Sequence, residues 1–162
     1  MERLHVSRSR LASVENHVGY DTQDVSDKPN GFWWSVDRSW LDWCESNDFR
    51  IGGHVHALEI DETRILRISS VDDFDEFANR FDAPFSSQFS FLRGICWNHV
   101  ASHYDGVEIA PYLWDRRHHD SSFWYGTWDC ASGVTWRPDR VIKSIRYVEE
   151  WKQTAEQVEM GA

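Results

Sequence analysis

The chain has 162 residues, the length of one domain, and we expect a single domain over residues 1–162. Its net charge of -10 and pI near 5.1 exclude a general affinity for nucleic-acid backbones and anionic membrane surfaces. No run approaches the roughly 18 apolar residues that a membrane-spanning helix needs. No leader-like segment precedes Leu4, and the three cysteines have no paired spacing, so we expect a cytoplasmic protein without disulfides.

The first third of the chain combines short strands with one helix. Residues 3–7 alternate between apolar and polar side chains and predict a strand, and the polar stretch 16–30 predicts a long loop. Ser39, followed three residues later by Asp42, forms a capping box, so we expect a short helix that ends before Gly52. Residues 54–61 and 64–68 predict a hairpin-like pair of strands.

The middle of the chain carries the clearest helix signal. A capping box at Ser70 precedes phenylalanines at helical spacing, and Pro84 ends the helix because it disfavours helical backbone in the residue before it. A second helix is expected over residues 97–104, followed by an Asp-Gly turn and a strand over residues 106–109.

The last third is more ambiguous. Residues 123–128 and 133–136 predict two strands. From Pro138 we expect a helix whose inner face carries Val141, Ile142, Ile145 and Val148. The arrangement of elements predicts an α+β fold with two small, mostly antiparallel sheets around a cleft and with flanking helices. Ten tryptophans exceed what packing usually requires, so some are expected to line a concave site.

Three separated segments carry the functional signal. They are Leu4-His5-Val6-Ser7, the segment GFWWSVDRSWLDWC over residues 31–44, and YDGVEI over residues 104–109. In this order they resemble the motifs of the ADP-ribosyltransferase fold, in its histidine-aromatic-glutamate class. The resemblance implies an ADP-ribosyltransferase-like fold in which NAD, as cosubstrate, lies in a cleft between two sheets.

The resemblance also implies roles for single residues. His5 would bind the adenosine ribose, and Ser7 belongs to the strand whose backbone holds the nicotinamide amide. Trp33 stands where the family has a nicotinamide-stacking tyrosine, which keeps the aromatic face and loses the hydroxyl. Ser35 and Ser39 match the serine-rich turn, and Glu108 matches the catalytic acid. The segment Lys28-Pro29-x-Gly31-x-Trp33 together with YDGxEI resembles small bacteriophage proteins, which implies a host-directed role in the host cytoplasm.

Breaking the nicotinamide-ribose bond of NAD develops positive charge on the ribose, which a nearby carboxylate stabilises. Glu108 is the expected acid, and a surface acid on an edge strand is the alternative interpretation. For His5 the alternative is a partly buried strand histidine. For Trp33 it is core packing, since only one of Trp33 and Trp34 can face a given side of a strand.

Other clusters have weaker interpretations. Arg116 and Arg117 are predicted to grip the acceptor, because guanidinium groups bind carboxylates and phosphates bidentately; a solvated loop is the alternative. The Cys96-x-x-His99-x-x-x-His103 spacing suits a metal ion, but no fourth ligand is evident, so no metal is predicted. The segment WDCASG, over residues 128–133, predicts either a turn that borders the cleft or a simple Asx-type turn.

The sequence therefore predicts an NAD-dependent mono-ADP-ribosyltransferase that modifies a macromolecule, with a host or partner protein favoured over nucleic acid. One alternative is a non-catalytic acidic protein that occupies a basic partner surface. A second is hydrolysis of NAD with water as the acceptor. Neither the oligomeric state nor the identity of the acceptor follows from the sequence.

Overall fold

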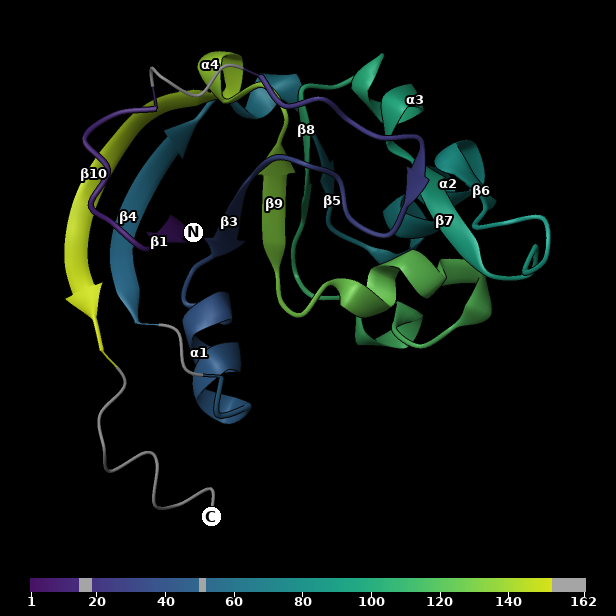
Figure 1. Ribbon diagram of the computed structural model, residues 1–162, viewed down its shortest axis with the longest axis horizontal. Helices are drawn as coiled ribbons and strands as arrows, with labels where there is room; N and C mark the ends of the chain where they lie inside the picture. Colours follow the sequence, from purple (N-terminus) through teal and green to yellow (C-terminus); the bar gives the residue numbers. More distant parts are fainter. Residues whose placement is uncertain (15–18, 50–51, 153–162) are drawn as a thin grey trace.

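The computed structural model describes residues 1–14, 19–49 and 52–152 (Figure 1). The strands are β1 (Arg3–Ser7), β2 (Val25–Ser26), β3 (Phe32–Val36), β4 (Gly53–Ile60), β5 (Ile65–Ile68), β6 (Asp82–Pro84), β7 (Arg93–Cys96), β8 (Gly106–Ile109), β9 (Ser132–Thr135) and β10 (Ile142–Trp151). The helices are α1 (Ser39–Ser46), α2 (Val71–Phe81), α3 (Trp97–Ala101) and α4 (Pro138–Val141), with 3-10 segments η1 (Glu62–Arg64), η2 (Trp114–Arg116) and η3 (Asp120–Thr127).

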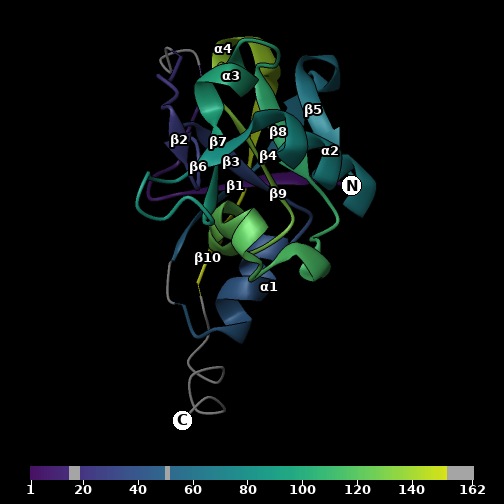
Figure 2. The ribbon, with the colours of Figure 1, turned by 90° about the vertical axis from the view of Figure 1, so that its right-hand side faces the viewer.

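The strands form two mostly antiparallel sheets. The larger has seven strands in the order β10-β4-β1-β3-β9-β8-β5, and the smaller has three in the order β2-β7-β6. Figures 1 and 2 both place α3 and α4 at one end of the molecule and α1 at the other. The predicted α+β class with two mostly antiparallel sheets is confirmed, although the larger sheet is not small.

The larger sheet is weakly joined in its middle. β1 pairs with β4 at four positions, from Leu4↔Ala57 to Ser7↔His54. On its other side β1 pairs with β3 at only two, Arg3↔Val36 and Leu4↔Ser35. Beyond Leu4, the part made of β10, β4 and β1 therefore separates from the part made of β3, β9, β8 and β5.

The predicted hairpin of residues 54–61 and 64–68 is wrong, although both strands exist. β4 lies between β10 and β1, whereas β5 forms the opposite edge of the sheet and pairs with β8 in parallel. The turn η1 separates them, with the Asp61 side chain accepting a hydrogen bond from the Thr63 amide at 3.1 Å. Alternation of apolar and polar residues within a strand shows that one face of the strand is buried. It does not specify which other strand it pairs with.

The helix predicted after Ser70 is confirmed. The Ser70 hydroxyl accepts a hydrogen bond from the Asp73 amide at 3.1 Å, and Phe74, Phe77 and Phe81 are buried. α1 begins at the predicted residue, but the Ser39 hydroxyl does not cap it: it donates to the Ala131 carbonyl at 2.6 Å. The loop expected over residues 16–30 is largely irregular over its described residues 19–30, and β2 lies within it.

The helix predicted from Pro138 is wrong beyond Val141. A single helical turn, α4, is followed by the ten-residue strand β10, which pairs with β4. The register shifts between Ile142 and Ser144 and again between Tyr147 and Glu149. Such irregularities insert a residue into the alternation, so the apolar residues recur at a spacing that resembles a helix.

The strand predicted over residues 123–128 is also wrong, because these residues form most of η3 and its end. Trp124, Tyr125 and Trp128 are all nearly inaccessible and belong to the main apolar core with Trp97 and Phe74. Burial of two consecutive residues and a third three positions later fits a helical turn better than a strand. Among the described residues, no helix is long and apolar enough to cross a membrane.

Candidate functional site

A pocket of about 480 Å³ opens where β1 and β3 separate. Its volume is within the range of small-molecule sites. The lining residues come from β1 and the residue after it, the loop before β3, β3, the start of α1, the residue before β4, and the loop before β9 with the first residue of β9. They are Leu4, His5, Val6, Ser7, Arg8, Lys28, Trp33, Trp34, Ser35, Trp40, Gly52, Trp128, Asp129, Cys130 and Ser132. Four residues predicted to bind the cofactor, His5, Ser7, Trp33 and Ser35, are therefore brought together around one pocket.

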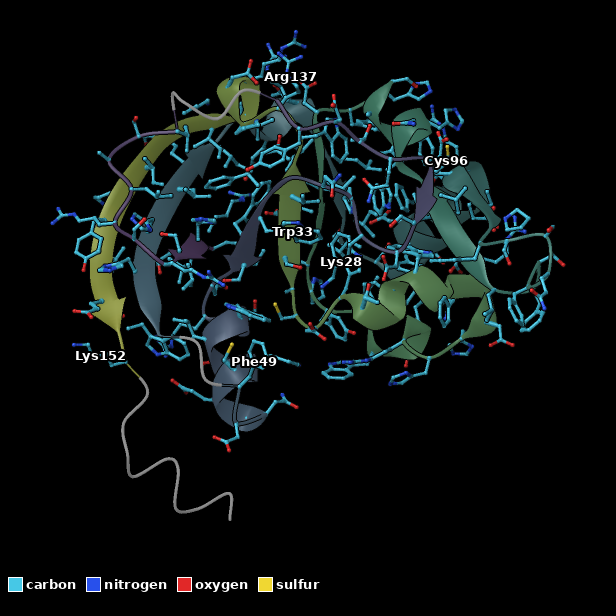
Figure 3. All side chains as sticks on the ribbon, viewed as in Figure 1. Lys28, Trp33, Phe49, Cys96, Arg137 and Lys152 are labelled. Carbon is cyan, nitrogen blue, oxygen red and sulfur yellow. The ribbon has the colours of Figure 1, made fainter. Side chains whose placement is uncertain are left out.

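Aromatic rings form much of the pocket wall. Trp33 lies edge-on to Trp128, with 4.9 Å between ring centroids. The Lys28 ammonium lies 5.5 Å from the Trp33 ring, and Figure 3 shows the two labelled residues near each other in the middle of the molecule. Trp33 is half-buried, whereas Trp34 is 2% exposed and packs in a separate cluster with Phe32. Both tryptophans line the pocket, and Trp33 is the more accessible of the two.

His5 bridges the two strands beyond the end of their pairing. Its Nδ1 lies 2.6 Å from the Trp33 carbonyl oxygen, and its ring stacks on Phe32 with centroids 4.0 Å apart. The Trp33 carbonyl can only accept, so Nδ1 carries the proton in this contact. A hydrogen bond and ring stacking therefore hold the His5 ring at the pocket edge.

The backbone of Val6 faces the separation between the strands. The Leu4 carbonyl accepts a hydrogen bond from the Ser35 hydroxyl at 3.4 Å and so points toward β3. In an antiparallel strand the N–H and C=O of alternate residues point to the same neighbour, so those of Val6 point the same way, where the pairing of β1 with β3 has ended. Val6 also lines the pocket. The wall thus offers a backbone donor and acceptor side by side, which suits a carboxamide.

The three predicted serines differ in position. Ser7 and Ser35 line the pocket, with the Ser7 hydroxyl donating to the Ser9 carbonyl and the Ser35 hydroxyl also within 3.2 Å of the Asp37 carbonyl. Ser39 is not among the lining residues. Its bond to the Ala131 carbonyl ties the start of α1 to the loop before β9, so it positions two walls of the pocket.

Glu108 is held in a buried ion network. Its carboxylate accepts from the Arg3 guanidinium at 2.7 and 3.0 Å and from the Trp34 indole at 2.8 Å, and Arg67 Nε lies 3.4 Å away. Arg3 also pairs with Glu62 at 2.6 Å, and these contacts together raise the pKa of its guanidinium against the opposing effect of burial. Glu108 is 1% exposed and is not one of the residues that line the pocket. Its geometry is that of a structural carboxylate.

Asp129 is the one carboxylate among the lining residues in the described part of the chain. Its Oδ2 lies 3.9 Å from Lys28 Nζ, and its Oδ1 lies 3.7 Å from Arg117 Nη2. The Asp129 side chain is 24% exposed. Of the two interpretations of the WDCASG segment, the structure therefore supports the turn that borders a cleft.

The two arginines predicted to bind an acceptor have different partners. Arg116 binds Asp75 of α2 bidentately, with both contacts at 2.7 Å. Arg117 lies beside Asp129 and over the rings of Tyr112 and Trp114, at 5.7 and 5.8 Å. Arg116 is thus tied to a helix, whereas Arg117 is directed toward the acid of the pocket.

The Cys96, His99 and His103 spacing does not produce a ligand set. The rings of His99 and His103 pack against Phe81, with centroids 4.9 and 6.0 Å away. Within residues 1–14, 19–49 and 52–152 no three histidine, cysteine or acidic side chains are arranged to hold a metal ion.

Cys130 lines the pocket beside Asp129, and burial raises the pKa of its thiol to about 11. The thiol is therefore protonated near neutral pH and is a poor nucleophile. All three cysteines lie in the described part of the chain, and none forms a disulfide there.

Arg8 was not predicted as a site residue, and Trp40, Trp128 and Cys130 lie in motif segments in which no binding role was predicted for these residues. These come from separate segments, and only their convergence at the separation of β1 and β3 makes them a site. Comparison of the chain with protein-family models, curated proteins and solved structures finds no match.

Proposed function

We propose that this protein binds NAD in the pocket between β1 and β3 and transfers ADP-ribose to a macromolecular acceptor. The observation that carries the proposal is that His5, Ser7, Trp33 and Ser35, selected from the sequence for NAD binding, all line this single pocket. They come from two strands that are paired at only two positions, and the pocket occupies the place where the pairing ends.

The chemistry of the walls suits the parts of NAD. The Val6 backbone donor and acceptor, which point toward β3, match the nicotinamide carboxamide, and the half-buried ring of Trp33 suits stacking on the cationic nicotinamide ring. Arg8 and Lys28 supply positive charge for the pyrophosphate. His5 is held at the pocket edge, where it would contact the adenosine ribose.

A protein acceptor fits the charge of the chain better than a nucleic acid does. The net charge of -10 opposes association with a phosphate backbone and favours a basic protein surface. A host or partner protein in the cytoplasm is the acceptor that we propose.

The test is incubation of the purified protein with NAD labelled on its adenylate half, in an extract of its natural cellular setting. We expect release of nicotinamide and transfer of label to a discrete protein acceptor. Label that is released as free ADP-ribose while nicotinamide is produced would instead identify an NAD hydrolase.

A folded protein that neither binds NAD nor releases nicotinamide would reject the proposal. Binding of a basic partner that weakens with salt and is indifferent to NAD would then support the acidic binding protein.

A further inference from the structure

We infer that Asp129, and not Glu108, is the catalytic carboxylate of the pocket. The inference rests on the proposed function, since it assigns the acid that ADP-ribosyl transfer requires. Asp129 lies in the loop before β9, and β9 pairs with β3 from Phe32↔Thr135 to Ser35↔Ser132. The loop therefore ends beside the strand that carries Trp33, and Asp129 lines the same pocket as Trp33 and His5.

The oxygens of Asp129 are available for a ligand. Its two cationic neighbours are 3.9 and 3.7 Å away, beyond hydrogen-bond range. Among the described residues, none donates a side-chain or backbone hydrogen bond to the Asp129 carboxylate, which is 24% exposed. Lys28 and Arg117 therefore place positive charge beside the carboxylate without occupying its oxygens.

Glu108 has the opposite surroundings. Arg3 and Trp34 supply three hydrogen bonds to its two oxygens, and its side chain is 1% exposed. A ribose hydroxyl would have to displace a charge-assisted bond inside the core to reach it. This would leave a buried group unpaired.

Position along the sheet separates Glu108 from Trp33, the ring that we propose stacks on nicotinamide. Glu108, Gly133 and Trp34 occupy directly paired positions on β8, β9 and β3. Side chains at paired positions share one face of a sheet, so Glu108 lies on the face of Trp34. Trp33 lies on the other face and contacts Trp128, the residue before Asp129.

The reaction needs one carboxylate that does not form a covalent bond. The bond between the nicotinamide nitrogen and ribose C1′ breaks, and its electron pair leaves with the nitrogen and neutralises the pyridinium charge. Asp129 accepts a hydrogen bond from a ribose hydroxyl and stabilises the positive charge that develops on the ribose. The acceptor then forms a bond to C1′ and releases its proton to solvent, so the products are ADP-ribosylated acceptor, nicotinamide and a proton.

The experiment compares three isosteric variants of the full chain, Asp129→Asn, Glu108→Gln and Asp115→Asn. Asp115 is exposed and lies outside the pocket, so its variant is the matched control for loss of one surface charge. Each variant is measured for nicotinamide release, for NAD affinity by tryptophan fluorescence, and for thermal stability.

We expect Asp129→Asn to lower nicotinamide release about a hundredfold while NAD affinity and melting temperature stay near those of the wild type. We expect Asp115→Asn to leave all three unchanged, and Glu108→Gln to lower the melting temperature. Near-normal nicotinamide release by Asp129→Asn, with the wild type active, would overturn the role of Asp129 and leave the proposed function standing. Loss of release in a stably folded Glu108→Gln would transfer the role to Glu108. An inactive wild type would reject the proposed function itself and the role of Asp129 with it.

Discussion

The indole N–H of Trp34 donates to Oε2 of Glu108 at 2.8 Å, across the whole width of β9. The contact crosses Gly133, where an added Cβ would lie 2.4 Å from the Trp34 ring, so only a glycine leaves room for the indole. Together with the two bonds from Arg3 on β1, it joins three strands of the larger sheet through one carboxylate. The network therefore fastens β1 to the rest of the sheet next to the point where β1 and β3 separate.

The first prediction concerns this network. Glu108→Leu should lower the free energy of unfolding by about 3–5 kcal/mol, because it leaves the buried Arg3 guanidinium without its main partner. Denaturant unfolding measures the effect. In the double variant Arg3→Met with Glu108→Leu, we expect part of the loss to be recovered, because no unpaired charge remains buried. A single variant as stable as the wild type would contradict a structural role for Glu108.

The second prediction concerns Gly133. Gly133→Ala should destabilise the fold by about 1–3 kcal/mol, since the new methyl group forces the buried Trp34 ring to move. The matched control is Gly126→Ala, where nothing lies within 4 Å of the added Cβ. Thermal unfolding of both proteins tests the prediction. Equal stability of the two variants would show that the Trp34 ring relaxes without cost.

The third prediction concerns Trp33. Trp33→Ala should weaken NAD binding about 5- to 160-fold, which corresponds to the loss of about 1–3 kcal/mol of stacking on an aromatic face. Trp33→Tyr keeps an aromatic face at this position and should keep most of the affinity. Calorimetric titration with NAD measures both variants. Unchanged affinity in Trp33→Ala would show that Trp33 serves core packing only.

The fourth prediction concerns pH. His56 is fully buried, its Nε2 accepts from the Leu11 amide at 2.9 Å, and burial lowers the pKa of the ring. The backbones of His5 and His54 oppose this lowering of the pKa, whereas the charges of His54 and Arg10 add to it. The rings of Tyr147 and His5 pack within 5.6 and 6.3 Å. Protonation of Nε2 would remove the acceptor for Leu11.

The unfolded chain, with a histidine pKa near 6.5, therefore binds more protons than the folded chain below about pH 6.5. The His56 contribution to stability is complete above that pH. Below it, this contribution falls by about 1.4 kcal/mol per pH unit until the folded pKa is reached. Melting temperatures between pH 8 and 5 should show a decline that His56→Gln reduces and that His119→Gln, at an exposed position, does not. Equal slopes in all three proteins would exclude His56 as the cause.

The sequence by itself determined secondary structure where all the signals for an element lie close together in the chain. The helix after Ser70 was predictable because its cap and its phenylalanines all lie within a dozen residues. The same holds for β1, β4 and β8, where alternation or a preceding turn marks the strand. β10 was mistaken for a helix because two register shifts disturb its alternation, and only pairing with β4 reveals a strand.

The candidate site likewise has features that were predictable from the sequence and features that only the tertiary structure decides. Residue types such as the histidine of β1 and the aromatic pair of β3 were recognisable from the sequence, and His5 and Trp33 both line the pocket. Which acid shares the pocket depended on tertiary structure. A strand position alone does not show which face of the sheet meets the core, and the surroundings of Glu108 and Asp129 are set by residues distant in the sequence. Arginine and tryptophan surround Glu108 and make it structural, whereas the chain reversal before β9 leaves the oxygens of Asp129 at the pocket.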